Sequence, residues 1–389
     1  MSSPTHTGAF RFRSRCAVLV MPMAVVAAMV WSVSAQAAGS CGTVPDRDAT
    51  AKTQRYLEDG TWAQAREYRW QDSRAGVVQL RVAFHIIRHN DGSGGLYQPD
   101  GHIEELLSNA NGHLAGAGVE LVKYGDTLFI DDDTHYTVVW DYGYNDEAYA
   151  LLNTDVAEGA INIYMVPEFG WPGGLSSYPS SANQGIILSN YAIPWFGNDT
   201  TFTHEIGHYL HLYHTHDTQW WDYDVDPPEG WWGIECADGS NCGTAGDYLC
   251  DTPADPNLSD FPNTNCQWSD LPDDPCGTDV AYDPITTNRM SYAGSSCSST
   301  FTCQQLNVMA WSARNERADH IIGAAPPCIG DIFADCESSI PPDGIVGVLD
   351  LSTVLTHWGG EFSPADLDGN GTVDTGDLQL LLAHWGACE

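Results

Sequence analysis

The chain is poor in positive charge. Its 389 residues include 15 lysines and arginines against 52 aspartates and glutamates. Three of the basic residues lie in the first 37 positions, which carry no acid, so the remainder has 12 basic and 52 acidic residues, a net charge of −40. Such a surface repels phosphate backbones and has no basic patch to offset this, which disfavours a nucleic-acid partner. An acidic surface is compatible with solubility in salt and with calcium binding.

Beyond the N-terminus the sequence also lacks any run of 18 apolar residues, so we expect no membrane span in the processed chain. The N-terminus is typical of a secretory signal: basic Arg11, Arg13 and Arg15, a mostly apolar stretch over 17–33, and Ala-Gln-Ala at 35–37 as the cleavage motif. We expect a signal peptide over 1–37 and a secreted protein. An uncleaved membrane anchor is the alternative.

Cysteine, by contrast, is well represented. The 12 cysteines are typical of proteins exported to an oxidising compartment. Cys16 lies in the predicted signal peptide, which leaves eleven. Because this number is odd, at least one cysteine is unpaired or bonds to another molecule.

Composition divides the processed chain into three predicted parts. Residues 38–74 are polar and helix-compatible, with too few large apolar residues for a core, and we interpret them as a pro-segment or N-terminal extension. Residues 75–325 read as one α/β (α+β) domain with a mixed sheet. Residues 328–389 contain an internal repeat, in which Asp350–Gly359 recurs 27 residues on as Asp377–Gly386, and two such short helices would bury each other's apolar faces.

Several elements of the middle part are predicted from apolar periodicity. Asp100 is placed to cap a helix with apolar residues at 103, 106, 107, 110 and 114, and Thr302 with Gln305 predicts a capping box for a second helix. Residues 217–285 have no sustained period and predict an irregular region stapled by disulfides. Strands are expected at 77–87, 119–122, 127–130, 160–166, 173–178 and 185–189.

The central chemical signal is His204-Glu205-Ile-Gly-His208. On a helix, residues i and i+4 share a face with Cβ atoms about 5–6 Å apart, so two imidazoles can reach one zinc ion. Glu205 follows the first histidine and would reach a water on the metal. An exposed helix with two incidental histidines is the plain alternative to this reading.

A third histidine, His214, lies six residues after His208 and would complete a three-histidine catalytic site with an open position. His211 stands where the long form of this motif usually has glycine, at a left-handed turn that histidine tolerates better than most residues. His211 as the third ligand is the alternative. It would lie about 10 Å along an uninterrupted helix from His204, which is too far to share an ion comfortably.

Together with Asn288-Arg-Met290-Ser-Tyr292, this long motif resembles the metzincin zinc peptidases, in which such a methionine turn lies beneath the metal. More specifically, residues 41–320 resemble the pappalysins in their compact ulilysin-like form. The resemblance rests on the following residues: Ile161–Tyr164, Gly173-Gly174, Tyr178-Pro179, Thr203–Leu210, Leu212–Thr215, Gly246-Asp247, Asp251–Pro253, Asn288–Tyr292 and Cys297.

The resemblance implies a secreted endopeptidase with catalytic zinc and structural calcium. Zinc would activate a water whose proton passes to Glu205 and then to the leaving amine. Tyr292 would donate a hydrogen bond to the oxyanion or would be purely structural, and the strand at 173–178 would pair with an extended substrate. The resemblance also implies disulfides between Cys242 and Cys276 and between Cys266 and Cys297. It gives no pairing for Cys236, Cys250, Cys303, Cys328, Cys336 and Cys388.

The second copy of the C-terminal repeat has the spacing of an EF-hand-like calcium loop, with Gly371 at the sharp turn and Asp rather than Glu at position 12. The first copy has Ser339 and Pro341 where Asp is expected, although Asp343 and Asp350 remain. This small domain resembles dockerin repeats and implies a cohesin-like or cell-surface partner, the alternative being a stabilising tail. The predicted calcium ligands are Asp366, Asp368, Asn370, Thr372 through its backbone, Asp374 and Asp377.

Cys41, in Cys41-Gly-Thr43, lies far in sequence from the other cysteines of the processed chain. It resembles the start of the family's pro-segment, where a cysteine thiolate occupies the open position of the zinc and keeps the enzyme latent. A disulfide bond or a lipid-modified N-terminus are the alternatives.

Two rival functions remain at this point: a catalytically inactive adhesion module with a metzincin fold, and a zinc hydrolase acting on something other than peptides. The intact Glu205 argues against the first, and the resemblance of the substrate strand argues against the second.

Overall fold

The structure is a computed structural model. It describes residues 41–70, 76–139, 146–169, 173–190, 200–216, 221–222, 229–230, 233–294, 296–324, 345–360, 365–368 and 370–387. The predicted signal peptide and Cys328, Cys336 and Cys388 lie outside these residues. Within the described part of the chain, no helix is long and apolar enough to cross a membrane.

A mixed seven-stranded sheet forms the centre of the main domain. Six of its strands lie close to the predicted ones, whereas β13 was not predicted. The strand order is β13-β1-β5-β8-β7, with β2 and β3 pairing with the two halves of β1. Only β7 and β13 run antiparallel to their neighbours, and β7 ends the order at one edge. The strands are β1 (Val78–Arg88), β2 (Val119–Lys123), β3 (Leu128–Asp131), β5 (Ile161–Val166), β7 (Gly174–Ser176), β8 (Ile186–Ser189) and β13 (Ile321–Ala324).

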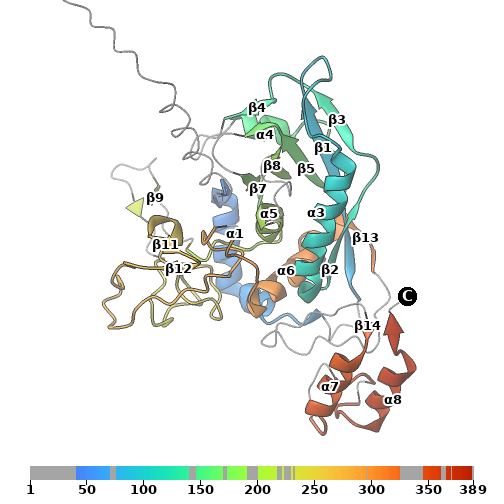
Figure 1. The fold of residues 1–389 in the computed structure, drawn as a ribbon. Coiled ribbons are helices and arrows are strands. Elements are labelled where there is room, and N and C mark those ends of the chain that lie inside the picture. The colour runs from blue at the N-terminus through green and yellow to red at the C-terminus, as the bar shows by residue number, and fades with distance from the viewer. Residues whose placement is uncertain are drawn as a thin grey trace, which may run out of the picture. The chain divides into compact units, whose positions relative to one another are not determined.

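Helices cover both faces of this sheet (Figure 1). All six residues of β5 are buried, as expected for a strand covered on both sides. Ile163 and Met165 point into the larger core with α3 (Pro99–Leu114), α5 (Thr200–Tyr209) and α6 (Cys303–Asn315). Tyr164 and Val166 point into a smaller core with α4 (Asp146–Leu152). The expected α/β fold with a mixed sheet and a buried active-site helix is therefore confirmed.

The N-terminal segment corrects one expectation. It forms α1 (Arg47–Asp59) and α2 (Thr61–Arg66). We expected this segment to have too few large apolar residues for a core, but those it has are buried in the core of the main domain. Trp62 is 1% exposed and, with Ala49, Ala65 and Trp70, belongs to the larger core of the main domain. The sequence reading missed this because these residues complete a core that is formed by distant segments.

Of the two predicted helix caps, one is formed and the other is not. The predicted capping box of Thr302 and Gln305 is formed at the start of α6. Asp100, however, does not cap α3, whose N-cap is Gln98 in a left-handed conformation. The Asp100 carboxylate instead accepts hydrogen bonds from Lys123 and Thr127 of the following strand region, so tertiary contacts override the local capping signal.

Short elements connect these layers, and the described residues of the expected irregular region, 217–285, contain only short strands and one 3₁₀ helix. The 3₁₀ helices are η2 (Ala115–Ala117), η4 (Leu258–Asp260) and η5 (Ala318–His320). The short strands are β4 (Thr137–Val138), β6 (Glu168–Phe169), β9 (Trp221–Asp222), β10 (Glu229–Gly230), β11 (Asn263–Thr264) and β12 (Gln267–Trp268).

Three disulfides staple the irregular region. Cys266 pairs with Cys297, as expected. The expected Cys242–Cys276 pair is wrong: Cys242 pairs with Cys250, and Cys276 pairs with Cys236. The tight turns after Cys236 bring Cys242 and Cys250 together at a Cα separation of 4.9 Å, which lies in the bonding range.

The C-terminal repeat folds into α7 (Val348–Thr356) and α8 (Thr375–Ala383), joined by a strand pair of β14 (Ile345–Val346) and β15 (Gly386–Ala387). The strand pair was not expected, because two-residue strands leave no periodic signal. The helices share a small core that contains Val354 and its repeat equivalent Leu381. Expected residues Ser339, Pro341 and Asp343 of the first copy lie outside the described residues.

Candidate metal centre

Helix α5 positions the first two histidines of the motif. All ten of its residues are buried, so His204 and His208 are held one turn apart in a rigid core element. The helix lies against β7 and β8 at the sheet edge. The four-residue spacing of His204 and His208 therefore places both imidazoles on one face of α5.

The chain reverses at His211 immediately after α5. His211 has φ 77°, the left-handed conformation expected for this position, and the Leu212 N–H donates back to the Gly207 carbonyl at 2.9 Å. The His211 ring does not join the other histidines. Its Nδ1 lies 2.7 Å from Glu316 Oε2 and its Nε2 lies 3.0 Å from Thr53 Oγ1. The turn therefore directs His214, not His211, back toward α5.

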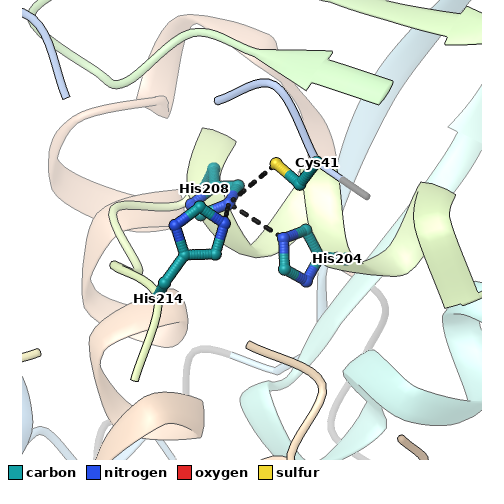
Figure 2. Close-up of side chains that lie close together, drawn as sticks. All are labelled: Cys41, His204, His208 and His214. Carbon is teal, nitrogen blue, oxygen red and sulfur yellow. Dashed lines mark hydrogen bonds between the residues drawn. The ribbon is translucent and has the colours of Figure 1, made fainter. Parts of the chain in front are cut away.

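Three imidazoles and one thiol converge at this point (Figure 2). His208 Nε2 lies 3.0 Å from His204 Nε2 and 3.1 Å from His214 Nε2. Around one tetrahedral ion with bonds of about 2.0–2.1 Å, ligand nitrogens lie about 3.3 Å apart. Cys41 Sγ lies 3.5 Å from His208 Nε2. The donor set thus fits a zinc ion with three histidines and a thiolate in the fourth position.

The outer nitrogens of two of these rings are fixed by backbone carbonyls. His204 Nδ1 lies 2.5 Å from the Arg289 carbonyl, and His208 Nδ1 lies 2.7 Å from the Leu212 carbonyl. A carbonyl only accepts, so each Nδ1 carries the proton and each Nε2 presents its lone pair. Burial, and then the neighbouring histidines, lower the pKa of His208 and of His214 well below the usual value, which favours the neutral ligand form.

Met290 lies against α5, the helix that carries His204 and His208. It is completely buried, and its sulfur would lie 2.7 Å from a Cβ placed on Gly207. Its amide donates to Asn288 Oδ1 at 2.8 Å, and its carbonyl accepts from the Thr215 amide at 3.1 Å. Met290 therefore contacts both α5 and the segment after it that carries His214.

Glu205 lies on the same helix at the side of β7. Its Oε2 accepts a hydrogen bond from Thr43 Oγ1 at 2.7 Å, while Oε1 is buried and has no hydrogen-bond partner in the described part of the chain. A Cβ on Gly174 would lie 2.6 Å from Oε1, so the absence of a side chain there makes room for the carboxylate. Burial raises the pKa of Glu205 to about 7, against the opposing hydrogen bonds from Thr43 and Cys41.

Residues 41–43 lie between β7 and these groups. Cys41 bridges to Gly174 in parallel register, and the Gly42 amide donates to the Gly174 carbonyl at 2.8 Å. The Tyr292 hydroxyl donates to the Cys41 carbonyl at 2.8 Å. The Cys41 thiol is buried, and its pKa is raised by burial and by the charge of Glu205. This short segment thus contacts His208, Glu205 and Tyr292.

Sequence reasoning missed a second group of buried acids. Glu235 and Asp247 are 5% and 1% exposed, and Glu235 Oε1 and Oε2 and Asp247 Oδ2 have no hydrogen-bond partner in the described part of the chain. Burial and the charge of Asp255 raise the pKa of Glu235 to about 8. Glu235 gave no signal because it is an isolated acid in an irregular region.

The hydrogen bond from Thr43 to Glu205 was also missed by sequence reasoning. It forms only because residues 41–43 pair with β7 in the folded structure.

Several known proteins are similar to this chain. An extracellular metalloprotease of Colletotrichum graminicola is 24% identical over 309 residues, which cover 74% of this chain and 96% of that protein. Extracellular metalloproteases of Podospora anserina and Coccidioides posadasii are each 24% identical and each cover 72% of this chain and 90% of their own length.

Among solved structures, a mutant of Tannerella forsythia promirolysin aligns with a TM-score of 0.46 and 17% identity over 73% of this chain and 97% of its own. Mature mirolysin in complex with a cleaved peptide aligns with a TM-score of 0.44 and 17% identity, covering 63% of this chain and 96% of that one. The family model described as pregnancy-associated plasma protein-A, peptidase M43, matches residues 172–313, which contain β7, the three histidines, Glu205 and Met290. Residues 172–313 of the chain are therefore similar to a peptidase M43 domain.

Proposed function

We propose that the chain is a secreted, zinc-dependent endopeptidase with His204, His208 and His214 as metal ligands. The observation that carries this is the convergence of three Nε2 lone pairs, two of them oriented by carbonyls, beside a buried carboxylate. The matched family and the relatives named extracellular metalloproteases support the same activity and location. A zinc ion held there would polarise the scissile carbonyl and acidify the attacking water.

The residues around the centre supply the rest of the chemistry. Glu205 takes a proton from the attacking water and returns it to the leaving amine, a role that suits a carboxylate on the same helix as His204 and His208. Tyr292 donates a hydrogen bond to the oxygen that gains charge, since its hydroxyl already reaches a main-chain carbonyl at this place. The β7 edge pairs with an extended substrate, as it does with residues 41–42.

Casein hydrolysis tests this function. Protein freed of residues 41–43 by proteolysis should hydrolyse casein, lose this activity when a zinc chelator is added, and recover it with one equivalent of zinc. Glu205→Gln protein prepared in parallel serves as the control for contaminating proteases. Activity that survives the chelator, or that equals the control, would contradict the proposal and favour the inactive adhesion module.

We further propose that the uncleaved chain is a zymogen and that residues 38–74 are its pro-segment. Cys41 would hold the fourth position of the metal, Thr43 engages Glu205, and the Cys41 carbonyl engages Tyr292. The first described residues thus block the ligand position, the base and the oxyanion donor together. A disulfide at Cys41 is not formed in the structure, where this cysteine is free.

Structural calcium is proposed at two places. In the C-terminal repeat, oxygens of Asp366, Asp368 and Asp377 lie within 4.8 Å of one another, and Gly371 has φ 93° at the turn position. In the main domain, both carboxylate oxygens of Glu235 and the Oδ2 of Asp247 are buried without hydrogen-bond partners in the described residues, beside Asp255. Buried, unpaired carboxylates are costly, and a calcium ion would satisfy them with the oxygen ligands that it prefers.

The C-terminal repeat is also proposed to dock on a cohesin-like or cell-surface partner. Leu355 and Trp358 are 56% and 44% exposed, and their repeat equivalents Leu382 and Trp385 are 53% and 46% exposed. Large apolar side chains that are exposed at equivalent positions of both copies favour a contact with another protein.

A further inference from the structure

His216 lies next to the metal centre but has no part in the mechanism given above. Its ring stacks on that of His214, with centroids 5.0 Å apart and an interplanar angle of 19°. The ring of Tyr292 lies 4.4 Å from His216 and 4.7 Å from His214. The Tyr292 ring is therefore held in the corner between the third histidine of the motif and His216.

The backbones that carry these two rings are tied together. Thr215 Oγ1 and Ser291 Oγ each donate to the same oxygen, Asp255 Oδ2, at 2.6 Å. The Thr215 amide also donates to the Met290 carbonyl. The residues immediately before His216 and Tyr292 are therefore held together, and the contact between the two rings is a restraint on where the Tyr292 side chain points.

The ring of His216 acts here as a packing surface. Its Nδ1 is buried and makes no hydrogen bond with the described part of the chain. The Tyr292 hydroxyl, at the other end of the packed ring, donates to the carbonyl of Cys41, the residue whose Sγ lies 3.5 Å from His208 Nε2. A shift of the Tyr292 ring toward the space of His216 would carry the hydroxyl away from that carbonyl position.

We propose that His216 is a positioning residue, which holds the Tyr292 hydroxyl where the oxyanion of the scissile peptide forms. This inference rests on the proposed peptidase function. A donor that acts only in the transition state affects kcat far more than KM, and small misplacements of such a donor are costly. The aromatic character of His216, and not its nitrogens, carries the effect.

A double-mutant cycle tests this inference on processed, zinc-loaded enzyme with a fluorogenic peptide. His216→Ala should lower kcat by about tenfold with KM unchanged. His216→Phe, which keeps a ring of similar width, should retain kcat within about twofold. In the Tyr292→Phe background, His216→Ala should cause no further loss, because the hydroxyl that it positions is already gone. Zinc content and the unfolding midpoint are measured for each variant.

Losses that multiply in the double variant, or a His216→Phe enzyme as impaired as His216→Ala, would overturn the positioning role while the enzyme remains a peptidase. A fall in zinc content that matches the fall in kcat would also overturn it, since His216 would then act through His214. A wild-type protein without zinc-dependent hydrolysis would overturn the proposed function itself, and this inference with it.

Discussion

Glu205 illustrates how a single carboxylate is prepared for proton transfer. One oxygen is held by Thr43 and the other lies buried against Gly174. Glu205→Gln keeps this shape but removes the base, so peptidase turnover should fall to below a few per cent of wild type. Bound zinc, measured by atomic emission, and the circular dichroism spectrum should be unchanged. Turnover above this level would assign the base to another residue.

Cys41 gives the matching prediction for latency. Without its thiol, the fourth ligand position is open to water, so uncleaved Cys41→Ala protein should hydrolyse a fluorogenic peptide while uncleaved wild type does not. Thr43→Val serves as the control, since it loses the hydrogen bond to Glu205 but keeps the thiol and should stay latent. A Cys41→Ala protein as silent as wild type would argue decisively against a cysteine cap.

Gly207 and Met290 form a pair that tests the support beneath the metal. Alanine usually stabilises a helix relative to glycine by about 1 kcal/mol, but here its Cβ would meet the buried Met290 sulfur at 2.7 Å. Overpacking of this kind costs about 1–3 kcal/mol. We expect Gly207→Ala to lower the free energy of unfolding, measured by denaturant titration. In the Met290→Ala background, where the sulfur is absent, Gly207→Ala should cause a smaller loss. Additive effects of the two changes would show that the contact is not limiting.

The candidate ligands were predictable because helix geometry fixes side chains four residues apart, and because the left-handed turn at His211 is tolerated by histidine. The partners of His211 were not predictable. Thr53 and Glu316 lie 158 and 105 residues away in sequence, and only the packed structure brings them to the ring.

At the level of whole elements, periodicity located the central strands and the capping box located α6, since both are local signals. The α1–α2 pair shows the limit of such reasoning, because Trp62 packs against rings from the turn after α5 and from the irregular region. Its ring makes edge contacts with His211, Tyr213 and Tyr248, and its Nε1 donates to the Tyr248 carbonyl at 3.1 Å. The disulfides of the irregular region were missed in part for another reason, since the tight turns after Cys236 bring Cys242 to Cys250 and not to Cys276.

Trp62 provides the prediction for this element. Trp62→Ala in the uncleaved chain should lower the free energy of unfolding by about 3–5 kcal/mol, the usual cost of removing a large buried ring. Trp62→Phe, which keeps most of the ring contacts and loses the hydrogen bond, should cost less. Both are compared by denaturant unfolding in the Glu205→Gln background, which prevents self-cleavage. An unchanged midpoint for Trp62→Ala would show that α2 unfolds separately from the domain.

For the molecule as a whole, the excess of acidic residues makes calcium a natural stabiliser. Calorimetric titration of the full chain should show calcium binding, and Asp368→Ala should remove one site, since Asp368 lies with Asp366 and Asp377 around the same point. Asp126→Ala, which removes an exposed acid away from both proposed sites, should leave the number of sites unchanged. Equal stoichiometry in the Asp368→Ala protein would refute the assignment of this loop.

The docking of α1 and α2 on the main domain separates cleavage of the chain from release of the N-terminal segment. Lys52 pairs with Glu316 at 2.7 Å, Thr53 contacts His211 and Tyr213, and Trp62 is enclosed by rings of the main domain. A cut C-terminal to α2 would break the chain without breaking these contacts, and Cys41 would remain over the metal. The protein would then be cut but still silent until the severed piece dissociates. The delay would be set by a dissociation rate, so the enzyme could diffuse away from the site of cleavage before it begins to act.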